Sequence, residues 1–396
     1  MEVRAPQTEE EWQEADAVFQ RGFGLFVDTD AFERNLARQM RDRYLAVFLD
    51  GRVAAAAQVR PFGMFLGGRS VPMGGYSPVA VAPEFRGFGH GTRVTEAHFS
   101  HLRERGEVLA GLYPASTKLY RGVGFEVAGV LVQHSIFTRH LNQIRPTVAW
   151  PTERRLTDDD IPAIKACYRR TAQRNQGWLD RPDSWWDQAI LENFAKEHWY
   201  GVDGDGGELA GYVRYRHARA SPPYSYGITV NELCADDPDV AIGLWKLVGS
   251  SSSQGHTTKF LGGHEHPLLV LLPEQDAKVE LDIRWMARVI DASAAVAARG
   301  FPAAVTGSVG LELRDPQCDW NAGSWTLTVE GGTGTLEKGG DGDVQLTING
   351  FSSLFTGYAT AETLRMAGLL SGGSPRDHDL LTAAFSTATP SIVDFY

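Results

Sequence analysis

The chain has few cysteines and no long apolar run. Its three cysteines, Cys167, Cys234 and Cys318, lie far apart in 396 residues and form no Cys-x-x-Cys pair. This spacing argues against a disulfide framework and a zinc site, so we expect no metal ion. No apolar stretch approaches the roughly 20 residues that span a bilayer, and the N-terminus lacks the apolar segment of a secretory signal. We therefore expect a cytoplasmic protein with no membrane partner.

Positive charge is also scarce. The sequence has 38 Lys and Arg against 49 Asp and Glu, which gives a formal net charge of −11. A nucleic-acid groove requires a basic face, so we expect no nucleic-acid partner. An acidic protein mildly favours a cationic substrate. At 396 residues the chain is too long for one ordinary core and should form two or three domains.

The most informative segment is a glycine-rich turn, Arg86-Gly87-Phe88-Gly89-His90-Gly91, between a strand-like run and a helix-compatible run. Glycines let the backbone turn tightly and let a ligand approach its N–H groups. The start of a helix attracts phosphate, and Arg86 adds a fixed cation. The segment therefore predicts a pyrophosphate cradle. Its glycine spacing is not the Rossmann Gly-x-Gly-x-x-Gly, and the Walker Gly-Lys-Ser/Thr is absent. A plain turn with no ligand is the alternative.

Residues 1–145 read as one α/β unit. Thr8 and Glu11 can form a capping box at a helix start, and Asp50-Gly51 is a strong hairpin signal. The expected helices are 8–20, 30–43, 92–105 and 118–122, and the expected strands are 44–50, 52–61, 70–81, 107–113 and 126–137.

The remaining sequence divides into two parts. Residues 146–285 again predict an α/β unit of helices and strands, but they lack the Arg-x-x-Gly-x-Gly segment. Residues 286–396 predict an α+β domain whose strands are separated by turns rich in glycine. In the first part we expect helices over 157–174 and 237–249 and strands over 199–202, 209–216 and 226–234. In the second we expect helices over 286–299, 361–370 and 380–384, and strands over 307–314, 323–330, 334–337 and 344–349.

The turn resembles the Arg/Gln-x-x-Gly-x-Gly/Ala signature of GNAT acetyltransferases, which bind acetyl-coenzyme A. Together with Val79-Ala80-Val81, the segment 119–125 and the aromatic C-terminus, it makes the whole chain resemble the enhanced-intracellular-survival (Eis) family. The resemblance implies an α/β (α+β) fold class of three domains. These are a GNAT domain with an acetyl-coenzyme A site (1–145), a degenerate GNAT domain (146–285) and a sterol-carrier-protein-like domain (286–396).

The resemblance also implies a mechanism. Acetyl-coenzyme A would be the co-substrate, a primary amine of a small cationic molecule the acceptor, and a hexamer the assembly. Tyr120 would be the general acid, because a tyrosine with a pKa of about 10 stays protonated at neutral pH. The α-carboxylate of Tyr396 would be the base, since burial of the apolar tail 392–396 raises carboxylate basicity. Tyr113 is the closest competitor for the acid, and simple packing is the alternative for both tyrosines.

The resemblance also implies which residues contact acetyl-coenzyme A and which contact the acceptor. For the cofactor they are Val79, Ala80, Val81, Arg86, Gly87, Phe88, Gly89, Gly91, Thr92 and Ser116. For the acceptor they are Phe23, Phe26, Asp28, Asp394 and Phe395. Leu25 stands where an acidic residue is expected, so an aminoglycoside is one acceptor class among several. A lipid- or acyl-binding carrier protein and a protein-lysine acetyltransferase are the alternative functions.

Overall fold

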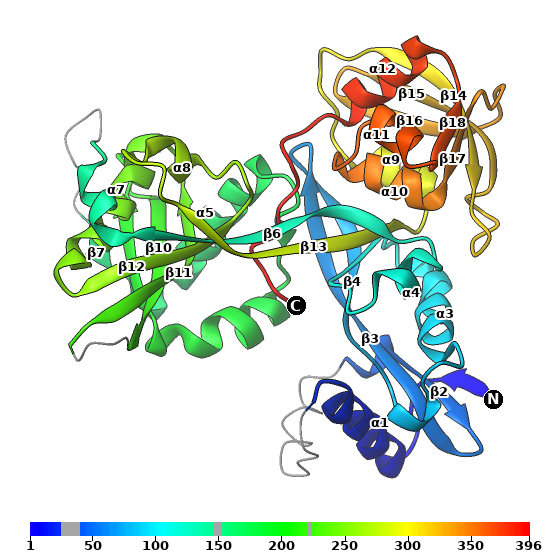
Figure 1. Cartoon of the computed structure of the whole chain (residues 1–396), viewed down its shortest axis with the longest axis horizontal. Helices are drawn as coiled ribbons and strands as arrows, with labels where there is room; N and C mark the ends of the chain where they lie inside the picture. Colours follow the sequence, from blue (N-terminus) through cyan, green and yellow to red (C-terminus); the bar gives the residue numbers. More distant parts are fainter. Residues whose placement is uncertain (25–39, 146–152, 220–223) are drawn as a thin grey trace. The chain divides into compact units, whose positions relative to one another are not determined.

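The computed structural model describes residues 1–24, 40–145, 153–219 and 224–396 (Figure 1). These residues form two units. The first contains residues 1–128, residues 284–388 and Tyr396, and the second contains residues 129–283 and 389–395. Among the described helices, none combines the length and the apolar character that crossing a lipid bilayer requires.

A mixed sheet with strand order β1-β2-β3-β4-β5-β13 forms the frame of the first unit. Its strands are β1 (Glu2–Arg4), β2 (Tyr44–Leu49), β3 (Arg52–Leu66), β4 (Arg69–Val81), β5 (Leu109–Leu112) and β13 (Lys278–Val289), of which residues 284–289 belong to this unit. The helices of this part are α1 (Glu9–Gly22), α3 (His90–Glu104) and α4 (Thr117–Arg121). Every strand pair is antiparallel except β4 with β5, which is parallel.

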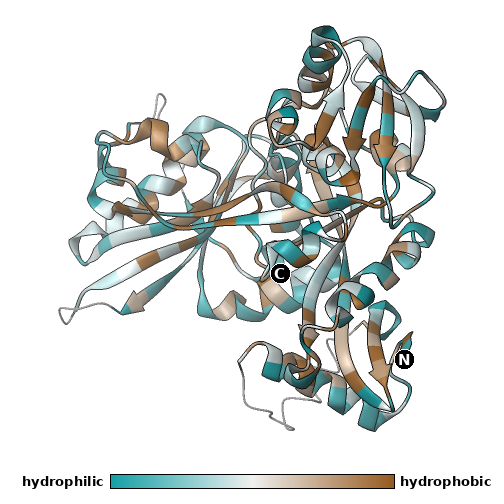
Figure 2. Ribbon diagram, turned by 45° about the vertical axis from the view of Figure 1, so that its right-hand side comes forward, coloured by the Kyte–Doolittle hydropathy of each residue, from teal (hydrophilic) through white to brown (hydrophobic). Residues whose placement is uncertain are grey.

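Helices α1 and α3 cover opposite faces of this sheet. On β3, Val53 and Ala56 belong to the apolar cluster of α1, whereas Ala55 and Ala57 belong to the cluster that contains Val94 of α3. Small alanine side chains let both helices approach the strand closely. Hydrophobic residues are accordingly concentrated in the strands, as Figure 2 shows.

Several local expectations for this unit are confirmed. Thr8 is the N-cap of α1 and accepts a hydrogen bond from the Glu11 N–H. The other half of the expected capping box differs, because the Glu11 carboxylate accepts from the Gln7 N–H and pairs with Arg4. Asp50 and Gly51 have φ of 48° and 81° and join β2 to β3 in a hairpin. Most of the helix expected over 30–43 lies outside the described residues, and its end, Arg41–Arg43, is a short 3-10 helix.

The helix expected over residues 286–299 is wrong in its first half. Met286 to Val289 are the end of β13 and pair antiparallel with β5, and a short helix, α9 (Ala292–Ala298), follows. Alanine, methionine and arginine favour helices locally. The free edge of β5, however, needs partners for its N–H and C=O groups, and β13 supplies them.

The rest of the first unit is an α+β part with a second sheet, in the order β16-β15-β14-β17-β18. Its strands are β14 (Gly307–Arg314), β15 (Gly323–Glu330), β16 (Thr333–Lys338), β17 (Val344–Thr347) and β18 (Leu370–Gly372). Its helices after α9 are α10 (Ile348–Thr356), α11 (Ala361–Met366) and α12 (Pro375–Phe385). The helix α10 was not expected from the sequence.

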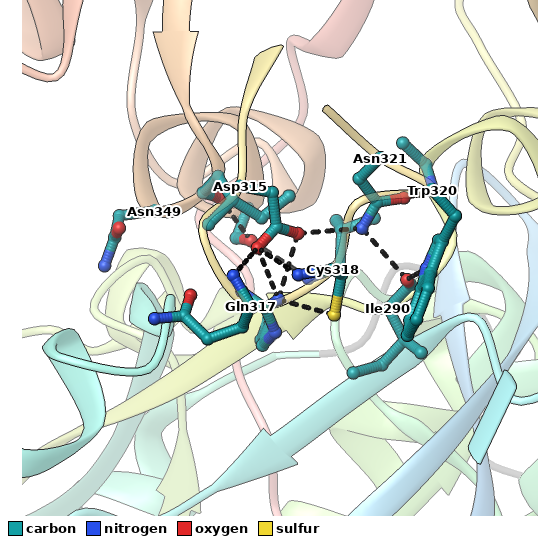
Figure 3. Close-up of polar contacts among 12 residues, drawn as sticks. Ile290, Asp315, Gln317, Cys318, Trp320, Asn321 and Asn349 are labelled. Carbon is teal, nitrogen blue, oxygen red and sulfur yellow. Dashed lines mark hydrogen bonds and ion pairs between the residues drawn. The ribbon is translucent and has the colours of Figure 1, made fainter. Parts of the chain in front are cut away.

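A buried ion pair fastens this α+β part to β13. The Arg288 guanidinium donates to both carboxylate oxygens of Asp315, at 2.8 and 2.9 Å, and to Cys318 Sγ at 3.0 Å. Asp315 also accepts from Asn321 Nδ2 at 2.9 Å (Figure 3). Since Arg288 and Asp315 are both buried, each charge depends on the other for compensation.

The second unit is built on a sheet with the order β6-β12-β11-β10-β9-β7. Its strands are β6 (Glu126–Phe137), which belongs to this unit from residue 129 on, β7 (Arg154–Arg155), β9 (His198–Asp203), β10 (Leu209–Arg219), β11 (Tyr226–Ala235) and β12 (Gly255–Gly262). The short β8 (Leu179–Asp180) lies between β7 and β9 in the sequence. Its helices are α5 (Ile161–Arg174), α6 (Asp183–Trp185), α7 (Pro238–Gly249) and α8 (Pro267–Leu271). Of the strand pairs that the structure describes in this sheet, only β11 and β12 are parallel. The helix expected over 237–249 is confirmed as α7, and Asp237 is its N-cap, whose side chain accepts from the Val240 N–H.

Candidate active site

The candidate site begins where β4 and β5 separate. They pair over three positions, from Met73 with Leu109 to Gly75 with Gly111. Beyond that point β4 continues to Val81 and stays paired with β3, with an extra residue inserted between Tyr76 and Val79. Since β5 ends at Leu112, it offers no partner to the last residues of β4. The backbone of Val79 to Val81 is therefore open on that side.

A pocket of about 670 Å³ lies at this opening. Its walls come from the end of β4, the glycine-rich turn, the first turn of α3, and α4 with the loop before it. The lining includes nine of the ten predicted cofactor contacts, namely Val79, Ala80, Val81, Arg86, Gly87, Gly89, Gly91, Thr92 and Ser116. The tenth, Phe88, does not line the pocket, and its side chain is 69% exposed.

The turn has the conformation that only glycine adopts easily. Gly87 and Gly89 have φ of 87° and 79°, and a Cβ built on either would meet no atom within 4 Å. Gly89 is the N-cap of α3 and has no side chain to cap it. Because the first turn of a helix leaves its N–H groups without intrahelical partners, this end of α3 can receive an anion.

Two ionisable residues of the pocket, His90 and Lys118, were not predicted from the sequence. His90 is buried in the first turn of α3, and its Nδ1 has no partner among the described residues. Burial, followed by the nearby Arg93 charge, lowers the pKa of His90. Lys118 adds an exposed cation from α4. The sequence signal for His90 is its place inside the glycine-rich turn, directly before Gly91.

Tyr120 lines the same pocket. Its ring packs edge-on against Phe125, with centroids 5.8 Å apart, in a cluster that also holds Tyr76 and Phe99. Burial raises the pKa of Tyr120 to about 12. No residue that the structure describes forms a hydrogen bond with this hydroxyl. Tyr113 does not line the pocket.

The chain end reaches the point where β4 and β5 separate. The Tyr396 ring lies 5.0 Å from the Phe62 ring and 5.4 Å from the Tyr113 ring, measured between centroids. It also lies against Gly75 and Gly111, the last paired position of the two strands. The C-terminal residue of the chain is therefore part of the first unit, beside the open end of β4.

Asp394 has a different setting from the one expected. It is buried in the second unit, where Arg181 Nε donates to its two carboxylate oxygens at 3.0 and 3.1 Å. Trp185 Nε1 also donates to it at 3.0 Å. A buried carboxylate needs such donors, so Asp394 holds the tail in place and is not an acid open to substrate.

The other predicted acceptor contacts are only partly described. Phe395 is 65% exposed, and Phe23, the C-cap of α1, is 60% exposed. Phe26 and Asp28 lie outside the described residues, as does Leu25. Across the residues that the structure does describe, no three His, Cys, Asp or Glu side chains gather in a way that would hold a metal ion.

Three parts of the chain match known domain families. Residues 2–128 match the model of an acetyltransferase (GNAT) domain, and residues 177–289 match a second model with the same description. Residues 292–393 match the model of a sterol carrier protein domain. The expected fold class, tandem GNAT folds followed by a sterol-carrier-protein-like domain, is confirmed by these matches.

Whole-chain similarity points the same way. A crystal structure of a GCN5-related N-acetyltransferase from Kribbella flavida is 30% identical and has a TM-score of 0.85, with 100% of this chain and 98% of that chain covered. Another from Anabaena variabilis is 26% identical, with a TM-score of 0.90 and full coverage of both chains. The N-acetyltransferase Eis of Mycobacterium tuberculosis is 25% identical over 87% of this chain and 83% of its own length.

Proposed function

Because the chain belongs to the GCN5-related N-acetyltransferases, in their Eis-like branch, we propose that it transfers acetyl from acetyl-coenzyme A to a primary amine of a small cationic molecule. One observation carries this proposal. The glycine-rich turn and Tyr120 line a single pocket of about 670 Å³, a volume within the range of ordinary ligand sites.

The residues of this pocket fit the co-substrate that the GNAT fold implies. The open backbone at Gly87 and Gly89 and the N–H groups at the start of α3 suit a pyrophosphate. Arg86 and Lys118 supply positive charge to the same walls. The edge of Val79 to Val81 that faces away from β3 suits the amides of the pantetheine arm, because an open strand edge can hydrogen-bond an extended chain.

Tyr120 is suited to the role of general acid. When bound, acetyl-coenzyme A supplies an acetyl group on a thioester sulfur. Tyr120 holds its proton at neutral pH, since burial raises its pKa to about 12, and its hydroxyl forms no hydrogen bond with any described residue. It would donate that proton to the departing sulfur.

The α-carboxylate of Tyr396 is suited to the role of base. Its residue lies at the last paired position of β4 and β5, where the strands open toward the pocket. The carboxylate would take the proton that the attacking amine loses. The rings of Phe62, Tyr113 and Tyr396 lie close together, and aromatic faces attract an ammonium group. The net charge of −11 also favours a cationic acceptor.

The acceptor class can be identified by a panel assay. Polyamines, aminoglycosides and lysine peptides would be compared for release of free coenzyme A thiol, with acetyl-coenzyme A binding measured by calorimetry. We expect turnover with small polyamines or aminoglycosides. Turnover only with peptides would favour protein-lysine acetylation, and binding of no acetyl-coenzyme A at millimolar concentration would overturn the proposal.

Two companion measurements address the remaining expectations. Mass spectrometry of the purified protein would reveal a bound lipid, which the carrier-protein alternative requires. Light scattering would test the hexamer that the family resemblance implies.

A further inference from the structure

Two strand glycines lie side by side at the position where β4 and β5 separate. Gly75 and Gly111 are partners in the parallel register, and both are buried. Glycine weakens a strand because it loses more backbone freedom than other residues and has no side chain to pack. Two of them in one buried position suggest that another group needs the space.

That group is the ring of Tyr396. A Cβ built on Gly111 would lie 2.8 Å from the Tyr396 hydroxyl oxygen, and one built on Gly75 would lie 2.9 Å from Tyr396 Cε2. The Tyr396 ring therefore packs directly on the backbone of Gly75 and Gly111, in space that side chains at these two positions would fill. On Gly75 the Phe62 ring is also close, at 2.7 Å from the built Cβ.

We propose that Gly75 and Gly111 are positioning residues, whose missing side chains set the place of the terminal carboxylate for acetyl transfer. This inference rests on the proposed role of that carboxylate as base. A methyl group at residue 111 would push the Tyr396 ring off the strands and carry the attached carboxylate with it. Displacements of about 1 Å in a catalytic group can lower turnover about 100-fold.

The neighbouring Gly74 provides a matched control. It is also a buried glycine of β4, but a Cβ built on it meets Leu102 at 2.6 Å and Val59 at 2.7 Å. These contacts lie in the core between the sheet and α3, and none involves Tyr396. Gly74→Ala therefore strains the same strand without touching the chain end.

A double-mutant cycle tests the proposed contact on the full-length protein. The atom nearest the new methyl group is the Tyr396 hydroxyl oxygen, at 2.8 Å, which Tyr396→Phe removes while the terminal carboxylate stays. Met73 Sδ, at 2.9 Å, is the next atom; it belongs to a flexible side chain that can move in both backgrounds, so its effect cancels in the cycle. We expect Gly111→Ala to lower kcat at least about tenfold in the wild-type protein, but less than about threefold in the Tyr396→Phe background. Acetyl-coenzyme A binding should stay within about twofold. Equal losses in both backgrounds would overturn the proposal.

A readout without catalysis separates this inference from the proposed function. Carboxypeptidase A releases an aromatic C-terminal residue only when it is accessible. Gly111→Ala should speed the release of Tyr396, whereas Gly74→Ala should not. Unchanged release overturns the positioning role. If Gly111→Ala speeds the release of Tyr396 but leaves kcat unchanged, the two glycines do position the chain end. In that case the terminal carboxylate is not the base, and it is the proposed function of this group that fails.

Discussion

Arg181 and Asp394, 213 residues apart in the chain, form a buried ion pair with distances of 3.0 and 3.1 Å from Nε to the two carboxylate oxygens. Arg181 also contacts Glu232 and stacks on Tyr168, with its guanidinium carbon 3.7 Å from the ring centroid. Asp394 lies two residues before Tyr396. The tail is further tied down by backbone bonds from Ser391 to Gln176 and from Ile392 to Val130.

This pair predicts the effect of Arg181→Met. The change leaves Asp394 and Glu232 buried without their shared cation, which should lower the free energy of unfolding by about 3–5 kcal/mol. It should also lower kcat, because the chain end loses its main anchor. Urea unfolding and steady-state kinetics measure both. Arg174→Met is the control, since Arg174 is half-exposed, and it should change stability by less than about 0.5 kcal/mol. Equal effects of the two substitutions would contradict the anchoring role.

Tyr120→Phe removes the proposed proton donor and leaves the ring in place. We expect kcat to fall by about 100-fold or more, with acetyl-coenzyme A affinity nearly unchanged. Tyr113→Phe is the comparison, because Tyr113 lies outside the pocket, and it should lower kcat less than about tenfold. Stopped assays of thiol release together with calorimetry give both quantities. If Tyr113→Phe proves the more damaging change, the acid role moves to Tyr113.

Gly89→Ala tests the glycine-rich turn. Gly89 precedes α3 with φ of 79° and Gly106 follows it with φ of 74°, and a Cβ at either would meet no atom within 4 Å. Both Ala variants should therefore lose about 1–2 kcal/mol of stability from the left-handed backbone conformation. Only Gly89→Ala should weaken acetyl-coenzyme A binding, by about tenfold, because it would shift the N–H groups at the start of α3 that are proposed to bind the pyrophosphate. Equal affinity for the two variants would refute the cradle.

His98 makes the stability of the fold depend on pH. It is buried on α3, and burial lowers its pKa to about 4 from the ordinary 6.5, with His101 and Arg105 adding smaller repulsion. Between these values the unfolded chain binds a proton that the folded chain does not. Stability should therefore fall as the pH drops from about 6.5 to about 4, by about 3 kcal/mol in all. Urea unfolding across this range measures the slope, and His98→Gln should flatten it. An unchanged slope in that variant would show that other groups dominate.

The sequence alone was sufficient where the signal is local. The hairpin at Asp50-Gly51, the N-cap at Thr8 and the glycine-rich turn before α3 each depend on residues within a few positions of one another. Backbone preferences and capping bonds act at that range, so the pattern of residue types is enough. The pocket-lining role of nine predicted residues follows from the same local turn, together with the strand and the short helix α4 around it.

Tertiary structure decided the features that depend on distant partners. The segment 286–289 has residues that favour a helix, yet it is a strand because β5, more than 170 residues earlier, presents an open edge to it. Asp394 was expected at the substrate, yet it is buried because Arg181 and Trp185 supply its donors. Gly75 and Gly111 carry no local signal for a tyrosine at residue 396. These contacts form only after the chain has folded and brought distant residues together. The residues next to each position in the sequence therefore could not predict them.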